Sequence, residues 1–183
     1  MPLFTSSEER RLWLCACIVV ATIISTLIFG RPFAELFANQ DVQAVIFLLG
    51  MVIIGTMMII HGIRTQPGKA EILIWLGFAA IFGMFFLRLG LAERSHLMEY
   101  AVLAIFVHMA LIERSGENNK VLKLALLAIG ITFTIGVLDE CVQIFLPNRV
   151  FDINDIMFNG FSAVMAIGTR IVLQWVRKRV GRT

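Results

Sequence analysis

Three short polar stretches interrupt an otherwise apolar chain, and they contain residue types that can transfer protons or bind ligands. The stretches cover residues 93–100, 139–143 and 148–160. Within them, three pairs stand three or four residues apart, which places each pair on one helix face: His96 with Glu99, Glu140 with Gln143, and Asp155 with Asn159. Carboxylates and imidazoles act as general acids and bases. An arginine fork such as that of Arg149 binds phosphate or carboxylate groups.

These patterns predict a single polar site with two kinds of residue. We expect Glu140 or His96 to act as a general base and Arg149 to hold an anionic group. The candidate catalytic residues are His96, Glu99, Glu140, Gln143 and Asp155. The candidate substrate-binding residues are Arg149, Asn159, Tyr100 and Asp152.

Structural interpretations of the same residues stay open. Asn154 or Asp155 can simply cap a helix. His96 can be an interfacial histidine, and Arg149 an ordinary loop charge. Glu140 and Gln143 are harder to explain in this way, because they interrupt an apolar run. Asp139 has no assigned part, because on a helix it lies about 100° away from Glu140.

No ligand spacing in the chain is typical of a metal centre, so we assign no metal and name no cofactor. A divalent cation held by carboxylate and imidazole ligands remains an alternative, with the ligands His96, Glu99, Glu140 and Asp155. The three cysteines form neither a zinc pattern nor a disulfide framework. His61 and His108 fall near the helix ends that lie away from the polar site, and they are interpreted as bystanders.

Composition indicates the elements that position these residues. The chain has 183 residues, of which 58% are hydrophobic and 16% charged, whereas soluble domains contain about 45–50% apolar and about 25% charged residues. The sequence therefore predicts an all-α, polytopic transmembrane bundle with short connections. It has six predicted helices, at residues 12–30, 42–63, 70–91, 96–112, 121–146 and 155–176.

The distribution of basic residues predicts the orientation of these helices. With six crossings, twelve of the 16 Lys and Arg residues fall on one side, and the other side holds only Arg31, Arg88, Arg94 and Arg149. Cytoplasmic loops are enriched in Lys and Arg, so both termini are expected in the cytoplasm and the polar site at the extracytoplasmic face. The basic residues near the C-terminus suit contact with anionic lipid, and no pattern suggests nucleic-acid binding.

The order and spacing of the polar residues resemble the VanZ-like family. The similarity comprises His96, Glu99 and Tyr100, then Glu140 and Gln143 followed by Pro147 and Arg149, then Asp155, Asn159 and Gly160. It covers about residues 90–175, and it departs from the family pattern at Asn148, where a glycine is frequent. The resemblance implies a bacterial cytoplasmic membrane, a cell-envelope context and a connection with glycopeptide susceptibility, since the family includes a teicoplanin-resistance accessory protein. Because most members lie outside resistance clusters, resistance is not carried over as the physiological role.

These observations divide the chain into three parts. Residues 1–91 form an N-terminal three-helix membrane portion, residues 92–176 a VanZ-like three-helix portion with the polar site, and residues 177–183 a basic cytoplasmic tail. The expected partners are the lipid bilayer and a lipid-linked or phosphate-bearing envelope precursor. The oligomeric state is not assigned.

Whether the protein is an enzyme stays open: the alternatives are a non-catalytic protein that binds an envelope molecule or antibiotic, and a transporter or flippase. Polar groups at only one end of the bundle disfavour the last of these.

Overall fold

The computed structural model describes residues 4–28, 42, 45, 68–88, 91–116, 121–146 and 150–180. Five helices lie in these ranges, with no strand among the described residues: α1 (Ser7–Ile28), α4 (Lys69–Arg88), α5 (Leu91–Ser115), α6 (Val121–Gln143) and α7 (Ile153–Val180). Apart from residues 42 and 45, the predicted helix 42–63 lies outside the described residues.

Four of these helices are long and apolar enough to cross a bilayer. They are Ser7–Ile28, His96–Ser115, Val121–Gln143 and Ile153–Val176, with mean hydropathies between 1.4 and 2.3. The expectation of an all-helical membrane protein is confirmed. Helix boundaries differ from the predicted ones by a few residues: α5 begins at Leu91 before its apolar run, and α7 continues through residues 177–180.

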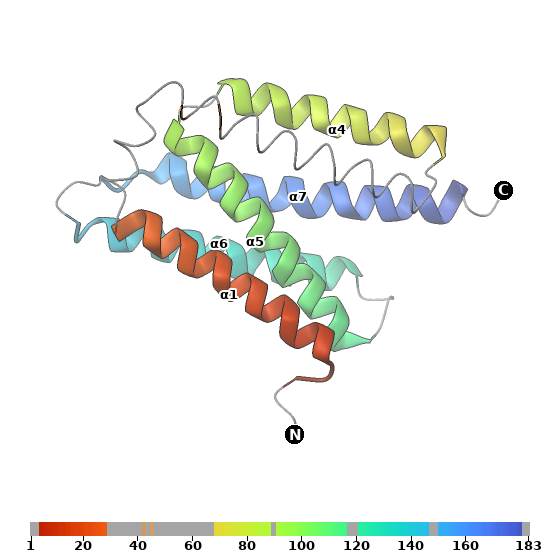
Figure 1. The fold of residues 1–183 in the computed structure, drawn as a ribbon, viewed down its shortest axis with the longest axis horizontal. Coiled ribbons are helices and arrows are strands. Elements are labelled where there is room, and N and C mark those ends of the chain that lie inside the picture. Colours follow the sequence, from red (N-terminus) through yellow and green to blue (C-terminus); the bar gives the residue numbers. More distant parts are fainter. Residues whose placement is uncertain are drawn as a thin grey trace.

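Helix α5 is the central element of the described bundle. It packs against α1, α6 and α7, while α4 packs on the outer side of α7 (Figure 1). The buried positions of α5 recur at the helical spacing of three and four residues, which gives this helix one continuous packing face. They are Tyr100, Leu103, Ala104 and Val107. Small residues on the facing helices, Ala125, Ala128 and Ala163, let the backbones approach closely.

Large apolar side chains cover the outer surface of the helices. Examples are Leu14 and Ile18 on α1 and Leu122 and Leu126 on α6, each more than half exposed. In water such a surface would be unfavourable, whereas in a bilayer the acyl chains contact it. The exposed apolar side chains of the described helices therefore suit contact with lipid.

A buried carboxylate fixes the beginning of α1 to the end of α5. Glu9 has no exposed surface and accepts hydrogen bonds from the backbone N–H and hydroxyl of Thr5, at 2.6 and 2.7 Å. It also accepts from Trp13 Nε1 and Arg114 Nη1, both at 3.3 Å. Beside it, the hydroxyl of Ser6 caps α1 by accepting from Glu9 N at 3.0 Å.

Replacement of Glu9 tests this contact. We expect Glu9→Ala to lower the Tm of the detergent-solubilised protein clearly, because four hydrogen-bond donors lose their acceptor. Glu8→Ala is the matched control, since Glu8 pairs only with Arg11 at 3.0 Å on the exposed face and such pairs contribute little. Differential scanning fluorimetry measures both. Equal Tm values for the two variants would contradict a structural role for Glu9.

Candidate functional site

The three polar stretches meet at one end of the bundle. The first begins α5, the second ends α6, and the third leads into and begins α7. Figure 1 shows that α6 runs opposite to α5 and α7, so the end of α6 lies at the same level as the beginnings of its two neighbours. The antiparallel packing thus gathers residues that are more than 40 positions apart in the sequence.

His96, Asp139 and Glu140 form the centre of this cluster. Each offers one nitrogen or oxygen atom, and the three atoms lie within 4.8 Å of one another. Asp139 and Glu140 are buried, and His96 is half-buried with its Nδ1 atom shielded from solvent. Two neighbouring carboxylates in such a place are costly, and this cost points to a purpose other than packing.

Neighbouring groups hold both oxygens of Glu140. Gln143 Nε2 donates to Oε1 at 2.7 Å from one turn further along α6. The backbone N–H of Asp152 donates to Oε2 at 3.2 Å, which connects the segment before α7 to the end of α6. The predicted pairing of Glu140 with Gln143 is therefore present, with both side chains buried.

Asp139 belongs to the same cluster, although the sequence analysis gave it no role. The hydroxyl of Tyr100 donates to Asp139 Oδ2 at 3.1 Å, and the ring of Tyr100 stacks on that of His96 with centroids 6.0 Å apart. Asp139 and Glu140 are both buried despite their angular offset, because Tyr100 of α5 contacts Asp139 and the backbone of Asp152, before α7, contacts Glu140. The four-residue spacing of Asp139 and Gln143 was a signal for a shared face.

Asn159 lies beneath the cluster, beside Tyr100 and Gly136. It has no exposed surface, and neither its amide oxygen nor its amide nitrogen has a hydrogen-bond partner in the described part of the chain. A Cβ atom on Gly136 would lie 3.1 Å from Asn159 Nδ2 and 3.3 Å from Tyr100 Cε1. Gly136 therefore makes room for both side chains. Gly160 approaches Phe133 in a similar way, at 2.9 Å from an added Cβ, whereas Gly168 faces open space.

The remaining candidates lie at the edge of the cluster or outside it. Glu99 and Asp155 are half-buried and are not among the three grouped residues. Asp152 caps α7: its Oδ1 accepts from the backbone and the side-chain nitrogen of Asn154, at 2.8 and 2.9 Å. The cap is therefore Asp152 and not Asn154 or Asp155. Arg149 lies outside the described residues.

Further buried polar groups follow the same helix interfaces away from the cluster. Thr132 on α6 is fully buried, and no described residue forms a hydrogen bond with its hydroxyl. Towards the other end, His108 of α5 is also fully buried, with its Nδ1 3.5 Å from Arg170 Nη1 of α7. The interpretation of His108 as a bystander took no account of this contact. His61 lies outside the described residues.

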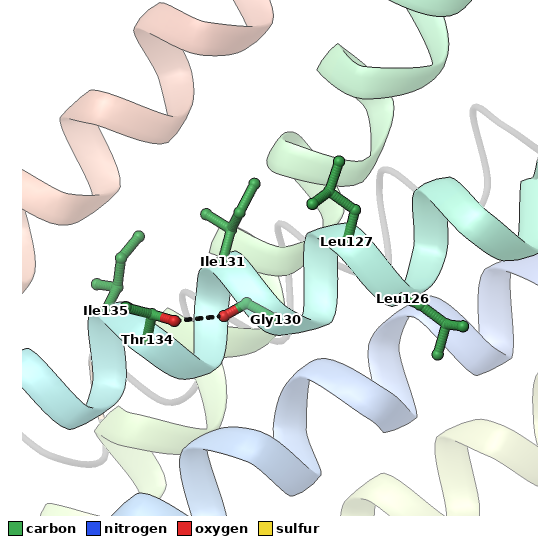
Figure 2. Close-up of a pocket in the computed structure, with 6 residues that line it drawn as sticks. All are labelled: Leu126, Leu127, Gly130, Ile131, Thr134 and Ile135. Atoms are coloured by element: carbon green, nitrogen blue, oxygen red, sulfur yellow. Dashed lines mark hydrogen bonds between the residues drawn. The ribbon is translucent and has the colours of Figure 1, made fainter.

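A shallow apolar groove on α6 is separate from the polar cluster. It has a volume of about 480 Å³ and is lined by Leu126, Leu127, Gly130, Ile131, Thr134 and Ile135 (Figure 2). The hydroxyl of Thr134 donates to the carbonyl of Gly130 at 2.8 Å, so it offers no free donor to a ligand. This groove can accommodate an acyl chain but has no group for acid–base chemistry.

The fold and the cluster together define a multi-pass helical membrane protein with a buried carboxylate–histidine site at one end of its bundle. The model of the VanZ/LLP1 family matches residues 12–174, and the chain belongs to this family. The match extends the resemblance, which the sequence analysis placed in the second half of the chain, back to α1. No curated protein and no solved structure gives a significant match.

Two glycines of α6 test the close packing beneath the cluster. We expect Gly136→Ala to lower the free energy of unfolding by about 1–3 kcal/mol, because the new methyl group overlaps Asn159 and Tyr100. Gly130→Ala is the matched control: nothing lies within 4 Å of its added Cβ, and alanine favours a helix by about 0.5–1 kcal/mol. Reversible unfolding in mixed micelles measures both values. If Gly136→Ala is as stable as Gly130→Ala, then Asn159 and Tyr100 do not pack closely against Gly136.

Proposed function

We propose that the protein binds or acts on a lipid-linked, phosphate-bearing molecule of the bacterial cell envelope at the extracytoplasmic face of the membrane. The observation that carries this proposal is the group of His96, Asp139 and Glu140, which places two carboxylates and an imidazole within 4.8 Å at one end of an apolar bundle. Ionisable groups at membrane depth are expensive, and they mark ligand or proton sites more often than packing contacts.

The proposed topology has six crossings, both termini in the cytoplasm and the cluster on the opposite side. Two observations support it. Helices α1 and α4 run in the same direction (Figure 1), which is the arrangement that one predicted crossing at 42–63 between them requires. The excess of Lys and Arg on the side that holds the termini agrees with a bacterial cytoplasmic membrane protein. The division at residue 91 and the tail at 177–183 are parts of the same proposal.

The proposed roles follow from position and chemistry. Glu140 is the candidate general base, with Gln143 and the Asp152 N–H to orient it. His96 is the second candidate for proton transfer, and Tyr100 and Asn159 form the floor of the site beside Gly136. Glu99, Asp155 and Arg149 complete the proposed set at the rim, where Arg149 would contact an anionic headgroup.

A non-catalytic binding protein is the second candidate, and transport the third. The same buried cluster would recognise an envelope precursor or a glycopeptide without changing it, and either activity would alter glycopeptide susceptibility. The sequence disfavoured transport because it placed polar groups at only one end of the bundle. The buried hydroxyl of Thr132 and the contact of His108 with Arg170 weaken that objection, since they bring polar groups deeper into the bundle. Product formation by the purified protein separates catalysis from binding without a reaction and from transport.

The topology proposal makes an accessibility prediction. In a background with Cys15, Cys17 and Cys141 replaced by serine, a single cysteine is introduced by Asn148→Cys or Thr183→Cys. On intact spheroplasts, a membrane-impermeant maleimide should label Asn148→Cys at once and Thr183→Cys only after lysis. Labelling of Thr183→Cys from outside would overturn the proposed orientation.

The site proposal predicts the effects of Glu140→Gln, His96→Ala and Arg149→Ala. If the protein is an enzyme, loss of the base should lower turnover by about 10²–10⁴-fold, with accumulation of the unprocessed envelope lipid. Mass spectrometry of extracted lipids and glycans, together with glycopeptide susceptibility of the cells, measures the result.

The control for these variants is Glu8→Gln. Glu8 is an exposed carboxylate in the first turn of α1, at the end of the bundle away from the cluster. Membrane abundance and melting temperature are compared for all four proteins. The function proposal fails if the three site variants fold normally and leave both the envelope profile and the susceptibility unchanged.

A further inference from the structure

We propose that His96, Asp139 and Glu140 bind a divalent transition-metal ion, Zn²⁺ or Mn²⁺. The proposal rests on the function proposed above and deepens it, because it makes Glu140 and His96 ligands of the ion in place of free proton-transfer groups. The binding of the ion itself is measurable without any substrate. Its first observation is geometric: one ligand atom from each of the three residues lies within 4.8 Å of the other two.

This separation suits an ion after small movements of the side chains. Zinc–nitrogen and zinc–oxygen bonds of about 2.0–2.2 Å place tetrahedral ligands about 3.4 Å apart. Because 4.8 Å is the upper limit of the observed separations, rotations that move atoms by roughly 1 Å bring all three into contact with one ion. Three protein ligands leave a fourth position for water or for a ligand oxygen, as in zinc sites that act on substrates.

The second observation is that both carboxylates have the outer hydrogen bonds that orient metal ligands. Gln143 and the Asp152 N–H hold the two oxygens of Glu140, and the Tyr100 hydroxyl holds Oδ2 of Asp139. Ligating carboxylates are commonly oriented in this way, and the outer partners fix the direction in which the free lone pairs point.

The third observation is an unpaired imidazole nitrogen. His96 Nδ1 is shielded from solvent and has no hydrogen-bond partner among the described residues, although the ring stacks on Tyr100. The amide of Asn159 lies beside Tyr100, whose hydroxyl donates to Asp139, and it is fully buried with neither polar atom bonded to a described residue. Buried polar atoms are nearly always satisfied, so the unpaired nitrogen of His96 and this amide point to a polar occupant nearby.

An ion also resolves an electrostatic difficulty in the proposed function. Two carboxylates repel a phosphate group, and the repulsion is strong where water is scarce. A divalent cation held between them would present positive charge to a phosphate oxygen at its open position. The mixed set of one nitrogen and two oxygen donors suits Zn²⁺ or Mn²⁺ better than Ca²⁺ or Mg²⁺, which prefer oxygen ligands alone.

The test uses the full chain in detergent micelles, stripped with a chelator and dialysed. Isothermal titration with ZnCl₂ and with MnCl₂, followed by elemental analysis, should give about one ion per chain for one of the two metals. Asp139→Asn and Glu140→Gln preserve shape and should lose this binding, and Tyr100→Phe should weaken it by about 10–100-fold. Circular dichroism checks that each variant is folded.

Cys141→Ser is the matched control, because Cys141 is an exposed thiol next to Glu140 that could capture zinc by itself. It should bind the ion like the wild type. X-ray absorption of the loaded wild type gives a result that needs no variant: nitrogen and oxygen scattering with an imidazole signature supports the site. Sulfur ligation, loss of binding in Cys141→Ser, or no uptake of either metal overturns it.

The two proposals fail in different ways. If the wild type takes up no ion while Glu140→Gln still changes the envelope profile, the metal site is wrong and the proposed function stands. If the ion binds as expected while no site variant changes the envelope or the susceptibility, the metal site stands and the proposed function is wrong.

Discussion

The burial of Asp139 and Glu140 at the end of an apolar helix is the constraint on which the described structure depends. Hydrocarbon cannot solvate a carboxylate, so each one needs donors from the protein. Among the described residues, Gln143 of α6 and the backbone N–H of Asp152, just before α7, donate to Glu140, and Tyr100 of α5 donates to Asp139. The site can therefore exist only where these three helices pack together.

A second buried carboxylate, on α1, lies at the other end of the bundle. Glu9 is buried, and part of its solvation comes from Arg114 at the end of α5. A second contact, from the hydroxyl of Ser6 to Glu113 at 2.8 Å, adds to the connection. Because apolar contacts between helices gain little in lipid, such polar contacts determine which helices become neighbours. α5 thus carries polar contacts at both ends, towards α6 near the site and towards α1 at the far end.

The sequence predicted the described helices to within a few residues, and the contacts between them only in part. Long apolar runs and the spacing of His96, Glu140 and Asn159 were enough to locate the helices and the end of the bundle where polar residues gather. The position of Asp139 could not be predicted from a single helix. Asp139 lies 100° from Glu140 on α6, and its burial depends on how many helices pack around α6. Both α5 and α7 pack against α6.

The same limit explains the cap of α7 and the role of Gly136. Several residues before α7 are suitable caps, and the choice of Asp152 follows from its backbone, which already donates to Glu140. Gly136 carries no chemistry, yet its missing side chain lets Tyr100 and Asn159 approach α6. The cluster is therefore determined by two kinds of residue: the polar ones that a sequence displays, and the small ones that decide how close their helices can come.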